Sequence, residues 1–330
     1  MKQYVIGIDI GGTNTVIGVV SRAGDVLASD SIKTRDYPSL DNYVTTLSSR
    51  IQALSDRCGV SGNIEGIGIG APNGNYYRGT IELAPNLPWK GVTIPLAQLI
   101  EGRTGIPTHL TNDANAAAMG EMTYGVARGL RHFIMITLGT GVGSGIIVDG
   151  NLLYGSTGFA GELGHVIVDR TPQARLCGCG RHGCLETYCS ATGIARTARE
   201  RLSYSVEPSL LRRIEPDKIT SRDIYDAAVE GDAMAISIFR ETGIILGRAL
   251  ADMCVFSSPE AIILFGGLAK AGDFIRRYTE EAMNENMLNI FHGTVRLLVS
   301  GLKDADAAVL GASALGWEKV VFEQNNVSSV

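Results

Sequence analysis

Long apolar segments, proline and a strong excess of one charge are missing or scarce in this chain of 330 residues. Its longest apolar runs, such as 133–136 and 261–265, are far shorter than the roughly 20 residues of a membrane helix. Residues 1–3 lead directly into an apolar pattern, without the basic start, apolar stretch and cleavage site of a secretory signal. We therefore expect a cytoplasmic protein that has no membrane partner.

Charge of either sign is modest. The net charge is −5 at pH 7, and charged residues make up 19% of the chain against 45% for apolar residues. This balance is typical of a globular protein and argues against a disordered chain or a surface for polyanions, so nucleic acid is not an expected partner. Only 10 residues are proline, whereas 41 are glycine, which predicts many tight turns. The length fits about two domains at roughly 150 residues each.

Apolar spacing predicts two α/β units that begin alike, with short strands around a glycine-rich turn. The predicted strands are 4–10, 15–21, 26–32, 64–70, 108–111, 132–138, 142–148, 151–154, 261–265 and 295–300. The predicted helices are 40–57, 95–104, 114–124, 191–202, 221–230, 232–254 and 306–320. This alternation is typical of an α/β protein with mixed sheets. Residues 323–330 are polar and non-periodic, so we expect this tail to fray.

The two glycine-rich turns, residues 11–14 and 139–145, each follow one strand and begin the next. Their backbone N–H groups can therefore face a polyanion with no Cβ in the way, and Thr13 and Thr140 add a hydroxyl to each. Neither turn has the P-loop pattern G-x-x-x-x-G-K-[ST], and neither opens a helix with G-x-G-x-x-G. One such turn alone would most simply be structural, but its repetition in two similar units favours phosphate binding.

A cluster of cysteines is the most specific local signal. Cys177, Cys179 and Cys184 lie close together with glycines between them. In a reducing compartment, such a cluster is more often metal-binding or catalytic than disulfide-bonded, and its spacing is not the C-x-x-C of redox sites. It fits tetrahedral Zn²⁺, which needs four ligands, and the fourth ligand could be His165 or His182.

A family resemblance rests on these motifs. Asp-Ile-Gly-Gly-Thr at 9–13 and Gly-Thr-Gly-Val-Gly at 139–143 resemble the two phosphate motifs of the sugar kinase/Hsp70/actin superfamily. Later segments are similar to the ROK family (repressors, open reading frames, kinases), and within it to glucokinase-like enzymes, so that the resemblance covers residues 3–320. Asn14 is a departure, because many ROK kinases have lysine there and the turn here lacks that cation.

The resemblance implies an actin-like ATPase (ribonuclease H-like) fold of two α/β domains, with mixed sheets and a cleft between the domains. The small N-terminal domain would comprise 1–111 with the C-terminal helix in 306–322, and the large domain, with the zinc-binding loop, would comprise 112–305. The implied activity is ATP-dependent phosphorylation of a hexose at its 6-hydroxyl. ATP with Mg²⁺ and a structural Zn²⁺ are the implied cofactors.

The resemblance also implies roles for single residues. Asp113 is the implied general base, and a carboxylate at a helix start can accept the proton of an attacking hydroxyl, although a simple helix cap would look the same. Asp9 would hold Mg²⁺ through water, unless it only caps a turn. The implied sugar contacts are Gly70, Asn86, Asn112, Asp113, Glu162, His165 and Glu186. The implied ATP and phosphate contacts are Asp9, Gly11, Gly12, Thr13, Asn14, Gly139, Thr140, Gly141, Gly266 and Gly267.

For the metal, the resemblance selects His165 with the three cysteines, so that the second ring nitrogen of His165 could face the sugar. Glucose is the favoured substrate, because residues 84–89 resemble the glucokinase version of that loop, although Trp89 could equally be ordinary core. N-acetylmannosamine, fructose and allose are alternatives. A ROK repressor would need a DNA-binding domain ahead of Tyr4, and a non-enzymatic actin-like ATPase would have no use for the sugar residues. We expect a homodimer or a homotetramer.

Overall fold

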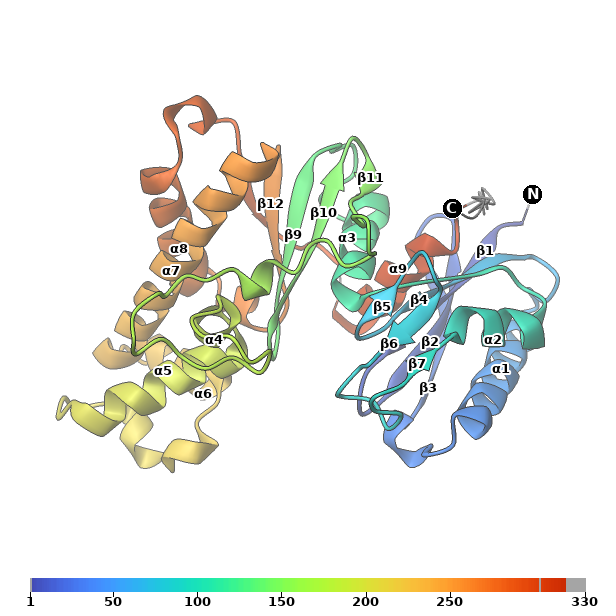
Figure 1. Ribbon diagram of the computed structural model, residues 1–330, viewed down its shortest axis with the longest axis horizontal. Coiled ribbons are helices and arrows are strands. Elements are labelled where there is room, and N and C mark those ends of the chain that lie inside the picture. The colour runs from blue at the N-terminus through green and yellow to red at the C-terminus, as the bar shows by residue number, and fades with distance from the viewer. Residues whose placement is uncertain (1, 303, 319–330) are drawn as a thin grey trace, which may run out of the picture. The chain divides into compact units, whose positions relative to one another are not determined.

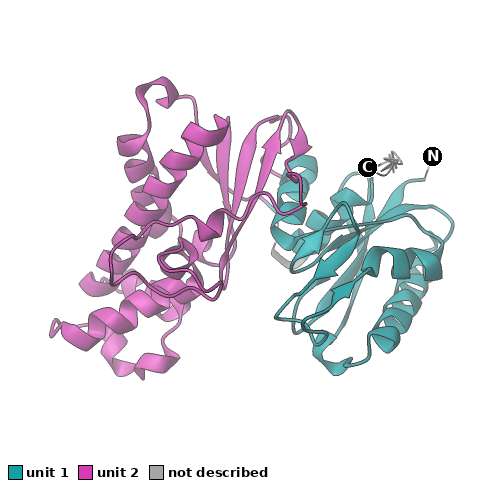
Figure 2. Cartoon of the chain, in the orientation of Figure 1, with its two compact units in different colours: residues 1–124, 302–330 teal, residues 125–301 magenta. Residues whose placement is uncertain are grey.

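The structure is a computed structural model that describes residues 2–302 and 304–318 (Figure 1). Figure 2 shows its two compact units, unit 1 (Met1–Tyr124 with Leu302–Val330) and unit 2 (Gly125–Gly301). The domain boundary predicted between 111 and 112 differs from this division at helix α3 (Asp113–Tyr124), which packs against α9 (Asp304–Leu315) inside unit 1. The predicted tail, 323–330, lies outside the described residues.

Unit 1 is built on a five-stranded mixed sheet in the order β3-β2-β1-β4-β8. Its strands are β1 (Tyr4–Ile10), β2 (Thr15–Ser21), β3 (Val26–Ile32), β4 (Ile64–Gly70) and β8 (Thr108–Thr111). The first three pair antiparallel, and β4 and β8 continue parallel to β1. All five strands coincide with the predicted ones. A three-stranded sheet of β5 (Gly74–Asn75), β6 (Thr80–Glu82) and β7 (Thr93–Ile94) was not predicted.

Alternating apolar side chains give the unit 1 sheet two covered faces. Ile6, Ile8 and Ile10 of β1 join a core with α1 (Leu40–Arg57) and α2 (Leu96–Thr104), which lie on one face in Figure 1. Val5 and Val20 point to the other face, where α9 packs. A Cβ at Gly7 or Gly68 would collide with the α9 backbone at Val309 or Ala312, so these glycines let the helix lie directly on β1 and β4.

Unit 2 repeats the topology of unit 1 in the order β11-β10-β9-β12-β13. The strands are β9 (Phe133–Leu138), β10 (Val142–Val148), β11 (Asn151–Leu152), β12 (Ala261–Phe265) and β13 (Arg296–Val299). Strands β9 to β11 pair antiparallel, and β12 and β13 run parallel to β9, as β4 and β8 do to β1. The prediction of two units that begin alike is therefore confirmed.

Helices supply most of the core of unit 2. They are α4 (Glu186–Cys189), α5 (Ala191–Tyr204), α6 (Ser221–Val229), α7 (Ala233–Ser257) and α8 (Asp273–Asn286), of which α4 and α8 were not predicted. Leu246 and Leu250 of α7 pack in one cluster with Ile275 of α8 and the apolar strand residues. Within the described ranges, none of the helices combines the length and the apolar character that a membrane span requires.

Candidate active site

Asp9 and Asp113 lie on either side of Gly70 in unit 1. The parallel register pairs Asp9 with Gly70 and Gly70 with Thr111, so the carboxyl ends of β1, β4 and β8 form one edge. A Cβ built on Gly70 would be 3.7 Å from Asp113 Cα and 3.9 Å from Asp9 Oδ1. Ligands of open α/β sheets bind outside this edge. The predicted base and the predicted Mg²⁺ residue therefore lie next to each other, with the predicted sugar residue Gly70 between them.

The surroundings raise the pKa of both carboxyls above the ordinary value of an aspartate. Burial, followed by repulsion from Asp113, raises the pKa of Asp9 to about 6. Protein packed around Asp113 raises the pKa of its carboxyl, although this effect is opposed by the hydrogen bond that Ala114 N donates to Oδ1 over 2.8 Å. The Asp113 side chain itself remains open to solvent. A carboxyl with a raised pKa that a substrate can reach is suited to general-base work.

Asn112, and not Asp113, caps helix α3. The side-chain Oδ1 of Asn112 accepts a hydrogen bond from Asn115 N over 2.6 Å, and its carbonyl accepts one from Ala116 N over 3.0 Å. This is the pattern of an N-cap residue. The alternative that Asp113 is only the helix cap is therefore wrong, since Asp113 is the first helical residue and its carboxylate is left for another role.

The first glycine-rich turn packs on the predicted sugar loop. Gly11 N donates to Asn14 O over 2.9 Å, which closes the turn between β1 and β2 and leaves Thr13 and Asn14 exposed at its tip. A Cβ on Gly12 would be 2.5 Å from the carbonyl oxygen of Asn86. Gly12 is therefore needed for contact between the two loops. Asn86 itself is exposed.

Trp89 belongs to the hydrophobic core, which is one of the two alternatives that the sequence analysis leaves open for this residue. It is 8% exposed, and its ring lies 4.5 Å from that of Tyr43, centroid to centroid. Tyr43 OH also lies 2.8 Å from Thr15 Oγ1, at the start of β2. Tyr43 therefore contacts both Thr15, which follows the first turn, and Trp89, which follows Asn86 in its loop.

The second glycine-rich turn, in unit 2, is held by the start of α5. Ala191 N donates to Gly139 O over 2.8 Å, and Thr192 Oγ1 donates to Thr140 O over 2.7 Å. Gly139 has open space where a Cβ would be, whereas a Cβ on Gly141 would be 2.6 Å from Glu186 Oε2. The family resemblance explains glycine at position 141 by a phosphate contact. The Glu186 carboxylate, which leaves no room for a Cβ there, is a second reason for glycine.

Gly266 and Gly267 follow β12 beside this turn. Gly266 has a φ of +99° and its missing Cβ would be 2.7 Å from Leu138 O, so both its conformation and its packing need glycine. Gly267 is exposed, and apart from its chain neighbours no atom in the described part of the chain lies within 4 Å of its missing Cβ. Of the pair, Gly267 is thus the one that leaves room for a ligand.

Four predicted metal ligands meet in unit 2. The donor atoms of His165, Cys177, Cys179 and Cys184 all lie within 4.8 Å of one another. Cys179 Sγ lies 3.7 Å from Cys184 Sγ, and Cys177 Sγ lies 3.7 Å from His165 Nδ1. Two thiolates on one tetrahedral Zn²⁺, with Zn–S bonds of about 2.3 Å, have sulfur atoms about 3.8 Å apart. The donor set and its spacing therefore fit zinc, and His165 rather than His182 supplies the nitrogen.

The predicted sugar residues of unit 2 surround this cluster. Glu186 Oε1 is 3.0 Å from Cys177 Sγ and 3.9 Å from His165 Nδ1, while Glu162 Oε2 is 3.8 Å from His165 Nε2. Glu162 and His165 also line a hollow of about 440 Å³ with Val166, Cys179 and Arg181. His165 thus turns Nδ1 to the cysteines and Nε2 to the side of Glu162.

Sequence reasoning missed the residue that anchors the Glu162 segment. Ser144 of β10, which is 2% exposed, donates from Oγ to Gly161 O and accepts from Leu163 N over 3.1 Å. No motif marks a lone serine in a strand. Its burial beside the segment is visible only in the folded chain.

Each unit therefore gathers its own share of the predicted residues. Unit 1 holds those around the first turn and the strand edge, namely Asp9, Gly11, Gly12, Thr13, Asn14, Gly70, Asn86, Asn112 and Asp113. Unit 2 holds those around the second turn and the cysteines, namely Gly139, Thr140, Gly141, Glu162, His165, Cys177, Cys179, Cys184, Glu186, Gly266 and Gly267.

Known proteins resemble this chain over nearly its whole length. The model of the ROK family matches residues 5–319. A glucokinase of Thermotoga maritima is 34% identical over 323 residues, which cover 97% of this chain and 99% of the relative. A glucokinase of Halalkalibacterium halodurans is 35% identical over 330 residues, covering 98% and 96%. A solved structure of a ROK family glucokinase from Streptomyces griseus, in complex with glucose and AMPPNP, has a TM-score of 0.77 and 34% identity, covering 94% of this chain and 98% of that one.

Proposed function

The chain belongs to the ROK family, and we propose that it is an ATP-dependent hexose kinase that converts glucose to glucose 6-phosphate. It has the two-domain actin-like ATPase fold of the sugar kinases in that family. The observation that carries the proposal is the placement of Asp9 and Asp113 around Gly70 at the carboxyl edge of a parallel strand set. One carboxylate can accept a proton, and the other can hold, through water, the Mg²⁺ that neutralises phosphate charge.

Asp113 is the proposed general base. The 6-hydroxyl oxygen of the sugar attacks the γ-phosphorus of ATP, the bond from that phosphorus to the β–γ bridging oxygen breaks, and ADP leaves. The hydroxyl proton passes to the carboxylate of Asp113. Because protein around Asp113 raises its pKa, the carboxylate is a better proton acceptor than an ordinary aspartate.

The glycine-rich turns are the proposed phosphate sites. Backbone N–H groups at Gly11–Gly12 and at Gly139–Gly141, with the hydroxyls of Thr13 and Thr140, can donate to phosphate oxygens, since the turn tips are exposed. Asp9 would hold Mg²⁺ through water, and the ion would neutralise phosphate charge. Gly267 leaves backbone space for the adenosine part of the nucleotide.

The proposed sugar contacts include the acidic residues near the cysteines. The carboxylates of Glu162 and Glu186 can accept hydrogen bonds from ring hydroxyls, and His165 can donate one from Nε2 when Nδ1 holds the metal. Asn112 would donate from Nδ2, because its Oδ1 caps α3. Asn86 and Gly70 complete the proposed set. Zinc on His165 and the three cysteines would supply a fixed scaffold that orients the His165 ring, and it takes no part in phosphoryl transfer.

Glucose is the proposed substrate among hexoses. Four relatives that are 34–38% identical to this chain carry the glucokinase name. The acceptors around the cysteines suit several hydroxyls, and a site built to pair hydroxyls rejects sugars that lack them. We further propose that the protein works in the cytoplasm, that its product enters glycolysis, and that it forms a homodimer or a homotetramer.

An ADP-release assay over a panel of sugars tests the function. We expect kcat/KM for glucose to exceed that for N-acetylmannosamine, fructose and allose by at least about tenfold, or about 1.4 kcal/mol in transition-state binding. Higher efficiency with a competitor would overturn the choice of glucose and leave the kinase intact. Turnover with none of them would favour a regulator or a non-enzymatic ATPase.

A further inference from the structure

Arg175 is a buried cation beside the cysteine cluster that the proposed chemistry does not use. Its side chain is 8% exposed and lies two positions before Cys177. Burying a guanidinium costs free energy unless its donors are all paired. The contacts of Arg175 therefore indicate which parts of the fold it holds together.

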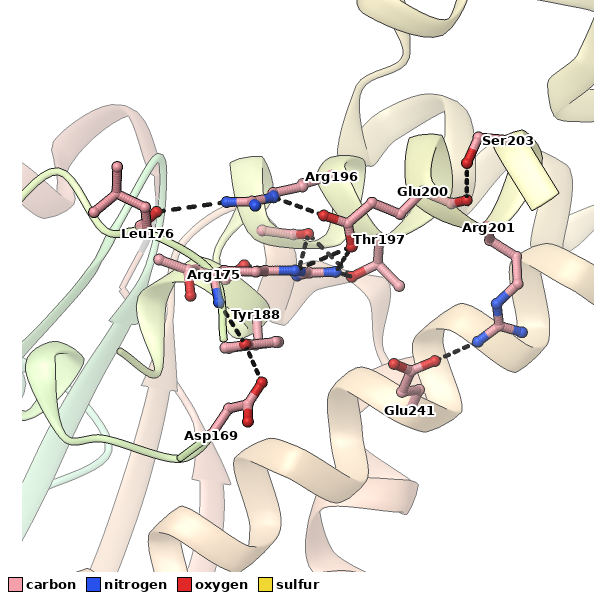
Figure 3. Close-up of polar contacts among 12 residues, drawn as sticks. Asp169, Arg175, Leu176, Tyr188, Arg196, Thr197, Glu200, Arg201, Ser203 and Glu241 are labelled. Atoms are coloured by element: carbon pink, nitrogen blue, oxygen red, sulfur yellow. Dashed lines mark hydrogen bonds and ion pairs between the residues drawn. The ribbon is translucent and has the colours of Figure 1, made fainter. Parts of the chain in front are cut away.

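The guanidinium of Arg175 connects helices α4 and α5. Nη1 donates to the carbonyl of Thr187 in α4 over 2.7 Å. Nη2 donates to Thr197 Oγ1 over 2.9 Å, and Nε donates to Glu200 Oε2 over 3.1 Å, both in α5. Figure 3 shows the guanidinium beside these α5 side chains, over the ring of Tyr188, whose centroid is 4.5 Å away.

The main chain of Arg175 connects to the metal loop. Its carbonyl accepts from Gly183 N over 2.9 Å, directly before Cys184. Its own N–H donates to Tyr188 OH over 3.1 Å, and Tyr188 OH in turn donates to Asp169 Oδ2 over 2.6 Å, as Figure 3 shows. One residue thus joins the start of the metal loop, its far end and both flanking helices.

We propose that Arg175 is a positioning residue for sugar binding, acting through Glu186. Glu186 begins α4 and precedes Thr187, whose carbonyl Arg175 holds. The Glu186 carboxylate fits between Gly141, on the side of Oε2, and Cys177, on the side of Oε1. Because Gly141 and Cys177 confine the Glu186 carboxylate from two sides, a small displacement of α4 would move the carboxylate from this position. This inference rests on the proposed sugar-binding role of Glu186.

The test compares Arg175→Met and Arg175→Lys with a matched control, Arg201→Met. Arg201 also forms a partly buried ion pair in unit 2, with Glu241 (Figure 3), but its hydrogen bonds to Ser237 and Glu241 join α5 to α7. For each full-length protein, we would measure zinc per chain, the thermal midpoint, kcat, and KM for glucose and for MgATP. Lysine keeps the charge but has no planar fork to reach three acceptors at once.

We expect Arg175→Met to keep zinc and to raise the glucose KM by between about 10-fold and 100-fold, the usual effect of losing a residue that orients a site. The MgATP KM should stay within about twofold. Arg175→Lys should raise the glucose KM by a smaller factor. If the methionine variant does not fold, the lysine variant provides the test. Arg201→Met should lower the thermal midpoint and leave the glucose KM unchanged.

Two results would overturn the inference: a wild-type glucose KM in a folded, zinc-loaded Arg175 variant, or an equal rise in Arg201→Met. A wild-type protein that phosphorylates no hexose would instead refute the proposed function, and this inference with it. The wild-type assay thus separates the two failures.

Discussion

Gly141 lies directly against Glu186, so that a Cβ at position 141 would come within 2.6 Å of Glu186 Oε2. Gly141 belongs to a proposed phosphate turn and Glu186 to the proposed sugar contacts. A change at Gly141 should therefore reach both substrates. The family resemblance implies only a phosphate contact for Gly141, and its contact with Glu186 adds a link to the proposed sugar residues.

The first prediction compares two glycines of that turn. Gly141→Ala should raise KM for both glucose and MgATP, because the new methyl group displaces the Glu186 carboxylate. Gly139→Ala should affect MgATP alone, since among the described residues, its two chain neighbours aside, no atom lies within 4 Å of its missing Cβ. Steady-state kinetics with each substrate varied in turn measures the difference. Unchanged glucose KM in Gly141→Ala would contradict the contact as a functional link.

The second prediction concerns the base. Asp113→Asn should lower kcat by about 10² to 10⁴, the usual cost of losing general-base catalysis, while glucose still binds. The helix should keep its cap, because Asn112 supplies it. Single-turnover kinetics and calorimetric glucose titration make the comparison. A variant with near wild-type kcat would remove Asp113 from this role.

The third prediction concerns the pH dependence of Asp9. Its pKa is raised to about 6 by burial and by Asp113, so the carboxylate loses its charge as the pH falls through that value. KM for MgATP should therefore rise below about pH 6 in the wild type. Asp9→Asn should have a high MgATP KM that varies little between about pH 5 and pH 7.5. An identical pH profile in both proteins would show that another group controls it.

The fourth prediction concerns stability at the same residue. A carboxyl whose pKa is higher in the folded than in the unfolded chain contributes stability at low pH and loses it as the pH rises through the folded value. For Asp9, the loss falls between the ordinary value of 3.8 and about 6. Without nucleotide, Asp9→Asn should therefore have a higher thermal midpoint than the wild type at about pH 7.5, and a smaller advantage at about pH 5. A lower midpoint at both values would contradict the raised pKa.

The fifth prediction concerns the metal. The purified protein should carry about one zinc per chain, and Cys177→Ala should lose zinc, melt earlier and raise the glucose KM. Cys254→Ala is the matched control, since Cys254 is equally a buried free thiol in unit 2 but is not part of the cluster. Elemental analysis and thermal melting give the result. Active, freshly prepared protein without zinc would overturn the assignment.

Much of the fold could be predicted because its strands are short, apolar and bounded by glycine or charged turns. Strand β1, for example, ends at Ile10 just before Gly11, and the prediction of 4–10 is confirmed. Helix α8 was not predicted because most of its 14 residues are polar or charged, and its buried residues, Ile275, Thr279, Ala282 and Met283, include one polar and one small side chain. Strands β5 to β7 have two or three residues each, too few for a pattern.

The sequence could indicate which residues belong to the candidate site, whereas it could not indicate which of them contact one another. The spacing of Cys177, Cys179 and Cys184 indicated a metal, but only folding separates His165 from His182 as the fourth ligand. The cap by Asn112 and the contact of Gly141 with Glu186 depend on distances between segments that sequence spacing does not contain. Arg175 carries no motif at all, and its burial alone distinguishes it from other arginines.

The return of the chain to unit 1 sets an order for folding during synthesis. Helix α9 packs on β1 and β4, yet the ribosome delivers it after the whole of Gly125–Gly301. Unit 2 is continuous and can fold as soon as it has emerged. Until α9 has been synthesised, one face of the unit 1 sheet, including Gly7 and Gly68, stays uncovered. A nascent chain stalled before residue 304 would thus expose apolar sheet to chaperones, and on completion of the chain unit 1 would become protease-resistant after unit 2.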